Sequence, residues 1–215
     1  MGEEKIKMSG RLLFLTSLFI TSLLVANVTA GKLVKLGSLI LPAAVFIFPV
    51  TFLVTDVVNE VWGKKRATEL VWLGFLMSIV LTGYLQLGRV LPPAPVWPYQ
   101  SAYEAIFGAV PRIVLASLCA YLVSQTHDVW AFNFWRQVTR GRHLWLRNNF
   151  STMVSQLMDT AVFITLAFVG TVPWDVLTGM IFSQYVVKLV LALADTPFCY
   201  LGVKWARKES GENAV

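Results

Sequence analysis

The sequence predicts an all-α membrane protein, a bundle of six transmembrane helices whose N-terminus and C-terminus are both cytoplasmic. Two observations support this fold class. Of the 215 residues, 56% are hydrophobic and only 14% are charged, whereas about a quarter of the residues are charged in a typical soluble domain. A helical membrane crossing needs about 20 mainly apolar residues, and six such stretches nearly fill the chain. We therefore expect one transmembrane domain over residues 1–215, with no room for a soluble catalytic domain.

The expected spans follow one another with mostly short connections. They cover residues 12–30, 38–62, 68–90, 103–126, 150–171 and 176–203. The first could instead be a cleaved secretory signal, because Ala26 to Ala30 offers small residues for cleavage. Its uncharged stretch of 19 residues exceeds the usual signal core of about 7–15 residues. We therefore expect the first span to be retained as a transmembrane helix.

The distribution of basic residues predicts the orientation, because Lys and Arg concentrate on the cytoplasmic side. With the N-terminus inside, 13 of the 18 basic residues are cytoplasmic: Lys5, Lys7, Arg11, Lys64, Lys65, Arg66, Arg136, Arg140, Arg142, Arg147, Lys204, Arg207 and Lys208. Only Lys32, Lys35 and Arg89 are then outside. The net charge of +6 is explained by this orientation and does not indicate nucleic-acid binding.

Two connections are longer than the others. Residues 91–101 contain four prolines together with Trp97 and Tyr99, which predicts a stiff, extended outer loop. Residues 128–141 carry Trp130, Phe134 and Val138 at helical spacing. We interpret this segment as an amphipathic helix on the cytoplasmic face; the alternative is an inward extension of the fourth span.

Five ionisable residues are difficult to place outside the membrane: Asp56, Arg112, Asp159, Lys188 and Asp195. Such groups cost several kcal/mol each in hydrocarbon unless they are paired or hydrated. Helical spacing adds polar neighbours on the same faces, because residues three or four apart lie on one side of a helix. The resulting stripes are Asp56–Asn59–Glu60, Thr152–Gln156–Asp159 and Gln184–Lys188–Asp195, and Asn27 adds an amide in the first span.

Prolines fall close to these charges. Pro49 precedes Asp56 by about two turns, Pro111 immediately precedes Arg112, and Pro197 follows Asp195 by two residues. Interrupted helices at membrane depth are tolerated where protein or a water-filled cavity satisfies the freed backbone groups. Isolated buried pairs that lock helices together are the alternative, and Glu60 with Lys64 is expected to be a solvated pair at the surface. The whole set favours a solute-binding cavity.

Two motifs then resemble a known family, the queuosine precursor transporters, also called the vitamin uptake transporter family. The first motif is Phe48-Pro49-Val50-Thr51-Phe52-Leu53-Val54-Thr55-Asp56, continuing to Glu60-Val61-Trp62-Gly63 and Arg66-Ala67. The second is Leu144-Trp145-Leu146-Arg147-Asn148-Asn149, leading into Ser151-Thr152, Ser155-Gln156 and Asp159-Thr160. The resemblance extends from about Asn27 to Pro197 and includes Arg112, Ser117, Gln125, Asp128 and Lys188.

The resemblance implies a multi-pass transporter of the cell inner membrane that imports 7-cyano-7-deazaguanine and 7-aminomethyl-7-deazaguanine for salvage into the modified tRNA nucleoside queuosine. Its partners would be this small-molecule solute and membrane lipid, with no nucleic acid and no cofactor; homodimer formation stays open. Some related chains carry a basic residue at the position of Glu60 and an Asp at Gln184, so these two rank below Asp56 and Asp159.

The expected substrate-binding residues are Asn27, Asp56, Arg112, Gln156, Asp159, Gln184 and Lys188. The two aspartates would accept amino and ring N–H donors of a guanine-like solute, and Arg112 and Lys188 would balance them and reach the ring carbonyl. Asn27 and Gln156 would set the edge pattern. Candidate stacking partners are Phe46, Phe48, Trp72 and Tyr84. Asp56 and Asp159 are candidates for proton coupling, with downhill entry and metabolic trapping as the alternative.

Three rival interpretations remain. One is a substrate-binding subunit of an ATP-driven vitamin importer, for which Ser22-x-x-x-Ala26 offers at best a weak docking surface. Another is an importer of a different purine-like or vitamin solute. An enzyme is disfavoured, because His127 and His143 are the only histidines and no HExxH, nucleophile elbow or phosphate loop occurs. We expect no metal site and no disulfide, since Cys119 and Cys199 are isolated thiols in spans.

Overall fold

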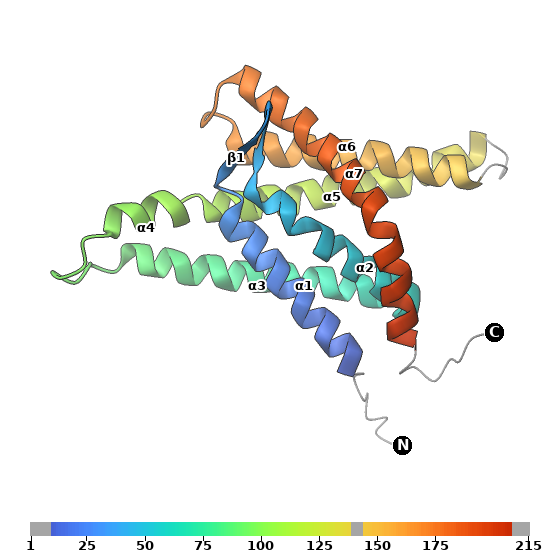
Figure 1. Cartoon of the computed structure of the whole chain (residues 1–215), viewed down its shortest axis with the longest axis horizontal. Coiled ribbons are helices and arrows are strands. Elements are labelled where there is room, and N and C mark those ends of the chain that lie inside the picture. Colours follow the sequence, from blue (N-terminus) through green and yellow to red (C-terminus); the bar gives the residue numbers. More distant parts are fainter. Residues whose placement is uncertain (1–9, 139–143, 208–215) are drawn as a thin grey trace.

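The computed structural model describes residues 10–138 and 144–207; within these ranges, the side chains of 128, 129, 131–138, 144–152, 192, 193, 195 and 196 are not described. The chain is mostly helical (Figure 1). Its elements are α1 (Gly10–Thr29), β1 (Leu33–Leu36), β2 (Leu39–Pro42), the 3₁₀ helix η1 (Ala43–Phe46), α2 (Phe48–Trp62), α3 (Lys64–Val90), α4 (Gln100–Phe107), α5 (Val110–Val138), α6 (Leu144–Phe168) and α7 (Trp174–Arg207).

Four helical segments of the described chain are long and apolar enough to cross a membrane: Gly10–Thr29, Lys64–Val90, Gln100–His127 and Trp174–Leu191. The apolar segment Met153–Phe168 is shorter. The protein is therefore a multi-pass, mainly α-helical membrane protein. The expected number of six crossings and the orientation of the termini stay predictions.

The expected second span, residues 38–62, is not one helix. Leu33–Leu36 and Leu39–Pro42 form an antiparallel hairpin around Gly37, whose φ of 60° lies in the left-handed region that glycine adopts at little cost. The helix begins only at Phe48, with Pro49 in its first turn, where a missing N–H breaks no intrahelical bond. At about 1.5 Å per residue, the 15 residues of α2 extend about 22 Å, less than the roughly 30 Å hydrocarbon layer.

The expected fourth span, residues 103–126, is also divided. Helix α4 ends at Phe107 and α5 begins at Val110, so Pro111 lies in the first turn of α5 and does not kink a longer helix. Helix α5 then continues without a break to Val138. The segment predicted as a separate amphipathic helix, residues 128–141, thus continues the fourth span as far as it is described.

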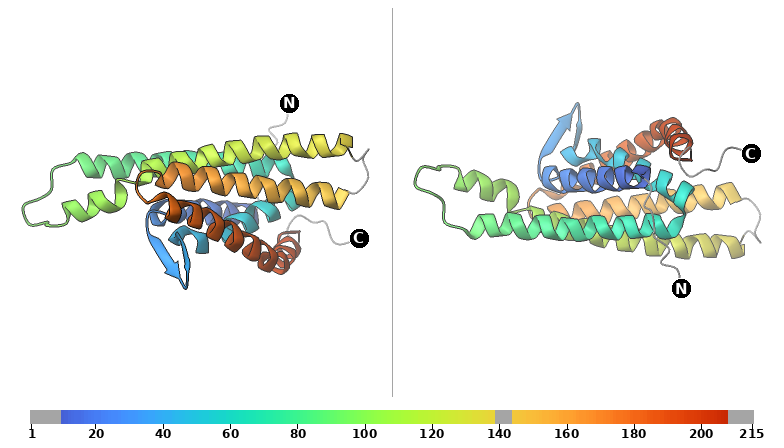
Figure 2. Two further views of the ribbon diagram at one scale, coloured as in Figure 1. Left: turned by 90° about the horizontal axis from the view of Figure 1, so that it is seen from above. Right: turned by 90° about the horizontal axis from the view of Figure 1, so that it is seen from below.

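Two apolar clusters hold the helices together. The hairpin-side cluster joins α1, η1, α5, α6 and α7, and consists of Ala26, Ala30, Ala44, Ile113, Ala116, Ala120, Phe163, Ile164, Ala167, Phe168, Leu177 and Met180. The junction-side cluster joins α1, α2, α3 and α7, and consists of Leu15, Phe19, Leu23, Val54, Val57, Val58, Leu70 and Ala206. Figure 2 shows the hairpin projecting from one face of this bundle, while the α3–α4 connection extends beyond one end.

The first turn of α1, the last turn of α7 and the end of α2 meet at one end of the molecule. The Arg11 guanidinium donates to the Trp205 carbonyl oxygen and lies over the Trp205 ring. Arg207 pairs with Glu60 at 2.8 Å. Glu60 was expected to pair with Lys64; the structure pairs it with α7 because Gly63, with φ 83°, separates α2 from α3 and breaks the helical i, i+4 relation.

A Gly74→Val substitution tests the close approach of α1 and α3. A Cβ at Gly74 would lie 2.6 Å from Phe19 Cε1 and 2.8 Å from Leu23 Cδ2, so valine must displace both side chains. We expect a loss of about 1–3 kcal/mol in the free energy of unfolding, the usual cost of overpacking, measured as a lower Tm in detergent. Gly83→Val on the same helix is the control, because a Cβ at Gly83 would have no neighbouring atom within 4 Å. Equal losses in the two variants would contradict this packing.

Candidate functional site

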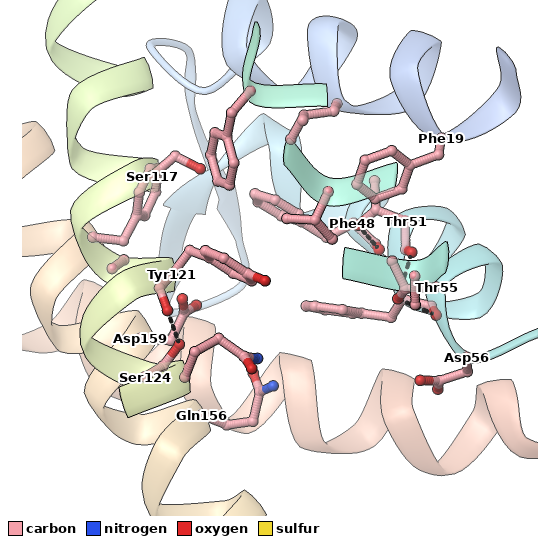
Figure 3. A pocket seen from close by; sticks show the side chains of 18 of the residues that line it. Phe19, Phe48, Thr51, Thr55, Asp56, Ser117, Tyr121, Ser124, Gln156 and Asp159 are labelled. Atoms are coloured by element: carbon pink, nitrogen blue, oxygen red, sulfur yellow. Dashed lines mark hydrogen bonds between the residues drawn. The ribbon is translucent and has the colours of Figure 1, made fainter. Parts of the chain in front are cut away.

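A cavity of about 500 Å³ lies between the two apolar clusters. Its walls come from six helices, and Figure 3 shows many of the lining side chains. The lining residues are Phe19 and Leu23 of α1; Phe48, Thr51, Phe52, Thr55, Asp56 and Asn59 of α2; Lys64, Ala67, Thr68, Val71 and Phe75 of α3; Ser117, Ala120, Tyr121, Ser124 and Gln125 of α5; Gln156, Asp159 and Phe163 of α6; and Gln184 and Lys188 of α7. Volumes of about 300–1,000 Å³ are typical of small-molecule sites.

An ion pair joins the α6 and α7 walls of this cavity. The Lys188 Nζ donates to Asp159 Oδ2 at 2.7 Å. The Lys188 side chain is only 6% exposed, whereas that of Asp159 is 24% exposed. The carboxylate therefore keeps access to the cavity while its charge is balanced by the buried ammonium. This pair brings together two residues that the sequence analysis assigned to a common site.

Aromatic rings of α2 face the same ammonium group. Lys188 Nζ lies 5.6 Å from the centroid of the Phe48 ring and 6.0 Å from that of Phe52. The two rings are stacked on each other, with centroids 6.3 Å apart and planes inclined by 21°. Cation–π attraction operates at these distances. Because Phe48 and Phe52 are one helical turn apart, they form a continuous apolar wall of the cavity.

Three amide atoms on the α6 and α7 walls have no hydrogen-bond partner among the described residues. Gln184 is 1% exposed, and neither its Nε2 nor its Oε1 atom has a hydrogen-bond partner in the described part of the chain. The Oε1 atom of Gln156 is also buried and has no hydrogen-bond partner among the described residues. Buried polar groups are nearly always hydrogen-bonded. These three atoms therefore mark unused hydrogen-bonding capacity at the cavity wall.

Helix α5 supplies the opposite wall with hydroxyl groups. Ser117, Tyr121 and Ser124 line the cavity along one face of α5, and Figure 3 shows them across the open space from Phe48 and Thr51. The Tyr121 ring packs against Phe75 of α3, with ring centroids 5.4 Å apart. The cavity is thus bounded by aromatic surface on two sides and by polar groups on α6 and α7.

The cavity opens beside the junction of α2 and α3. Its exposed lining residues are Asp56, Asn59, Lys64, Thr68 and Gln125, whereas the lining residues next to the hairpin-side cluster are buried or half-buried. Asp56 therefore lies near the mouth, away from the Asp159–Lys188 pair, as Figure 3 also shows for Asp56 relative to Asp159. The hairpin-side cluster closes the other end.

Two predicted site residues have partners elsewhere. Asn27 Nδ2 donates to Ser78 Oγ at 3.0 Å in a buried bond between α1 and α3. Arg112 donates through Nε to the Leu166 carbonyl oxygen at 2.7 Å and through Nη2 to that of Val169 at 2.5 Å. Carbonyl groups at a helix C-terminus lack intrahelical donors, so Arg112 caps the end of α6. Neither residue lines the cavity.

Of the four candidate stacking residues, only Phe48 lines the cavity. Phe46, Trp72 and Tyr84 are exposed on the outer surface of the bundle, where Tyr84 reaches 74% exposure. The sequence analysis did not single out Phe52, Tyr121 or Phe163 as cavity residues. Helical spacing could have identified two of them. Phe52 follows Phe48 by four residues and Tyr121 follows Ser117 by four residues, so each lies on the same helix face as a residue that the sequence analysis named. The side chain of Asp195 lies outside the described residues.

The described residues contain no group of three or more His, Cys, Asp or Glu side chains that would hold a metal ion. The described residues that line the cavity provide hydrogen-bonding groups, an ion pair and aromatic rings. A flat polar solute with several N–H donors fits these groups, because the walls offer a carboxylate and two amide oxygens beside aromatic faces.

Comparison with known proteins gives a consistent result. A family model described as "Putative vitamin uptake transporter" matches residues 42–202. A "Probable queuosine precursor transporter" of Bacillus subtilis (strain 168) is 39% identical over 180 residues, 83% of this chain and 79% of the relative. A "Queuosine precursor transporter" of Escherichia coli (strain K12) is 31% identical over 127 residues, 57% of this chain and 53% of the relative.

A further relative, a "Probable queuosine precursor transporter" of Haemophilus influenzae, is 27% identical over 122 residues, 56% of this chain and 49% of the relative. This chain thus spans most of the Bacillus protein and about half the length of the other two. No solved structure matches the chain.

A double-mutant cycle tests the cavity ion pair. We expect Asp159→Asn or Lys188→Met alone to lower the free energy of unfolding by about 2 kcal/mol. This is less than the roughly 3–5 kcal/mol of a fully buried pair, because Asp159 is partly exposed. The double variant should lose at least about 1 kcal/mol less than the sum of the single losses, since no unpaired charge is left.

The matched control for this cycle is the surface pair of Arg66 and Glu69, 2.8 Å apart with both side chains nearly half exposed. Arg66→Met and Glu69→Gln should each change stability by less than about 1 kcal/mol. Thermal unfolding in detergent measures both cycles. Additive losses at Asp159 and Lys188 would show that the two charges do not interact energetically.

Proposed function

This chain belongs to the vitamin uptake transporter family, and from that premise we propose that it imports queuosine precursors, 7-cyano-7-deazaguanine and 7-aminomethyl-7-deazaguanine, across the cell inner membrane. The matched family model covers residues 42–202. Three relatives named as queuosine precursor transporters, or probable ones, support the choice of solute class. The proposal treats the cavity as the site where the solute is held during transport.

One observation carries the proposal: hydrogen-bonding groups on α6 and α7 face the same cavity as aromatic rings. Asp159, Gln156 and Gln184 provide acceptors, and Gln184 also provides an amide donor. Phe48 and Phe52 provide a flat apolar wall. A 7-deazaguanine is a planar ring with a carbonyl, a ring N–H and an amino group along one edge. Its donors match the acceptors, and its ring faces match the aromatic wall.

We assign the site roles accordingly. Asp159 accepts N–H donors of the solute, and Lys188 balances the charge of the carboxylate through their 2.7 Å contact. Gln156 and Gln184 bind the other hydrogen-bonding groups along the edge of the solute ring, and Asp56 contacts the solute at the mouth of the cavity. Arg112 and Asn27 support the bundle through their bonds to α6 and Ser78. These two are not part of the proposed solute contacts.

The proposed topology has six crossings, with α1, α2, α3, α5, α6 and α7 as the crossing helices and both termini in the cytoplasm. The basic residues Arg11, Lys64, Lys65, Lys204 and Arg207 lie at the ends of helices that meet near the cavity mouth, which supports a cytoplasmic position for that end. The cavity would then be in an inward-open state. Alternating access would require the hairpin-side cluster to open in turn.

Uptake of labelled 7-cyano-7-deazaguanine by cells that cannot synthesise it tests the proposed function. We expect Asp159→Asn and Lys188→Met to transport at less than about a tenth of the wild-type rate, because losing one buried hydrogen-bonding or charged partner typically costs more than tenfold. Thr178→Ala is the control on α7, since the exposed Thr178 hydroxyl bonds only to its own helix among described residues. Normal uptake by the two site variants at equal membrane levels would exclude this site.

Purified protein in lipid vesicles separates the proposal from the rival of an ATP-driven importer subunit. We expect labelled solute to enter vesicles that contain this chain alone, without ATP or a partner protein. Vesicles with an imposed proton gradient distinguish proton coupling from downhill entry, because only a coupled carrier accumulates solute above its external concentration. Binding without any entry would favour the subunit interpretation.

Cysteine labelling tests the proposed topology. In a background with Cys119 and Cys199 replaced by serine, an impermeant maleimide added to intact cells should label Ala94→Cys in the loop after α3. It should label Lys65→Cys at the start of α3 only after the cells are permeabilised. Both positions are exposed, so access depends on the side of the membrane. The reverse pattern would mean that the termini are outside.

A further inference from the structure

Gln184 is the most completely buried polar side chain of the cavity wall, with 1% of its surface exposed. Its Nε2 and Oε1 atoms both lack a hydrogen-bond partner in the described part of the chain. Thr51, Lys188 and Asn27, which are also buried, all have partners. Because buried polar groups are nearly always hydrogen-bonded, a buried amide whose donor and acceptor are both unused indicates a hydrogen-bonding partner on a ligand in the cavity.

The position of Gln184 relative to the ion pair follows from helix geometry. Helices α6 and α7 are consecutive and antiparallel, and Asp159 contacts Lys188. Gln184 precedes Lys188 by one turn and therefore lies on the hairpin side of the pair, opposite the level of Phe163. Gln156 precedes Asp159 by about one turn on the antiparallel helix and lies on the mouth side. From the closed end to the mouth, the wall presents the Gln184 amide, the Asp159 carboxylate and the Gln156 amide oxygen.

This order of groups is selective. The Gln184 amide offers a donor and an acceptor at the closed end, and the Asp159 carboxylate and the Gln156 Oε1 atom offer acceptors toward the mouth. A ring edge with a carbonyl, then a ring N–H, then an amino group presents one acceptor followed by donors, which is the complementary order. An adenine-like edge has an amino group next to an unprotonated ring nitrogen and only a C–H beyond it, so it offers the Asp159 carboxylate no N–H donor. The wall therefore favours a 2-amino lactam.

We propose that Gln184 is a specificity-determining residue that recognises the ring lactam of the solute: Nε2 donates to the lactam carbonyl oxygen and Oε1 accepts from the adjacent ring N–H. Asp159 then accepts from the amino side of the same edge. This assignment rests on the proposed function for the identity of the solute, although the lactam preference itself depends only on the cavity wall. Both bonds form together because the primary amide places donor and acceptor side by side.

The test compares two ligands that differ only at the lactam. 7-Cyano-7-deazaguanine has the carbonyl and the ring N–H, and its 6-O-methyl ether lacks the N–H while keeping the amino group. We expect wild-type protein to bind the lactam at least about 100-fold more tightly, because a site built around a hydrogen bond strongly rejects a ligand that cannot make it. Isothermal titration calorimetry on the purified full-length protein measures both dissociation constants.

Variants of Gln184 should remove this preference. Gln184→Leu lacks both hydrogen-bonding atoms, and its ratio of dissociation constants should fall to about 10-fold or less. Gln184→Met keeps the length of the side chain but has neither the amide donor nor the amide acceptor, so it gives the same loss of ratio if Gln184→Leu fails to fold. Thr178→Ala is the control on the same helix and should keep the wild-type ratio. A purely structural role would lower stability and leave the ratio unchanged.

The outcomes separate this inference from the proposed function. If 7-cyano-7-deazaguanine binds and the Gln184 variants keep the full ratio, the lactam assignment is overturned and the proposed function stands. If the protein binds guanine or hypoxanthine instead, with a ratio against their 6-O-methyl ethers that depends on Gln184, the assignment stands and the solute is revised. If wild-type protein binds none of these lactams, or binds the adenine analogue 7-cyano-7-deazaadenine more tightly, the assignment is overturned.

Discussion

The structure depends on one constraint: a polar side chain at membrane depth must find a partner within the protein, because lipid offers none. The Asp159–Lys188 pair shows how the chain meets it. Each charge alone would cost several kcal/mol to bury, yet at 2.7 Å the two neutralise each other, and the rings of Phe48 and Phe52 lie next to the ammonium group. The pair fixes α7 against α6 and α2 at this level, and the remaining polar groups of the cavity are arranged around it.

The same constraint separates structural polar residues from those available to a solute. Asn27 is satisfied by Ser78, and Arg112 by carbonyl groups at the end of α6, so both are used within the bundle. Gln184 and the Oε1 atom of Gln156 are not satisfied by the described residues, although they are buried. Since leaving a buried amide unpaired costs about 1–3 kcal/mol per group, these atoms represent free energy that a matching ligand recovers on binding.

The sequence grouped several residues that line the cavity, because helical periodicity determines which residues of one helix share a face. Gln184 with Lys188, and Gln156 with Asp159, line the cavity as those stripes predicted. The relation between helices was harder to predict: the sequence analysis grouped Arg112 with Asp159, but α5 begins only at Val110, so Arg112 lies in its first turn, beside the end of α6. The hairpin before α2 was missed because residues 38–47 are as apolar as a span, and only Gly37, Pro42 and Pro49 indicated that the backbone turns there.

The two ends of the cavity differ in how strongly they are held. At the level of the pair, separating α6 from α7 would expose two opposite charges to a medium of low polarity. At the hairpin-side cluster, the contacts between helices are formed by Ala26, Ala30, Ala44, Ala116, Ala120 and Ala167 together with larger apolar residues. Helix association within lipid is driven mainly by van der Waals packing, since lipid tails are as apolar as the side chains. Apart from the Arg112 bonds that join α5 to the end of α6, parting this alanine-lined seam breaks packing contacts that lipid or neighbouring helices partly replace. Parting the ion pair has no such compensation. Under the proposed alternating access, this distribution of polarity would make the closed end the more easily opened one, and it would keep Asp159 and Lys188 together while the rest of the bundle rearranges.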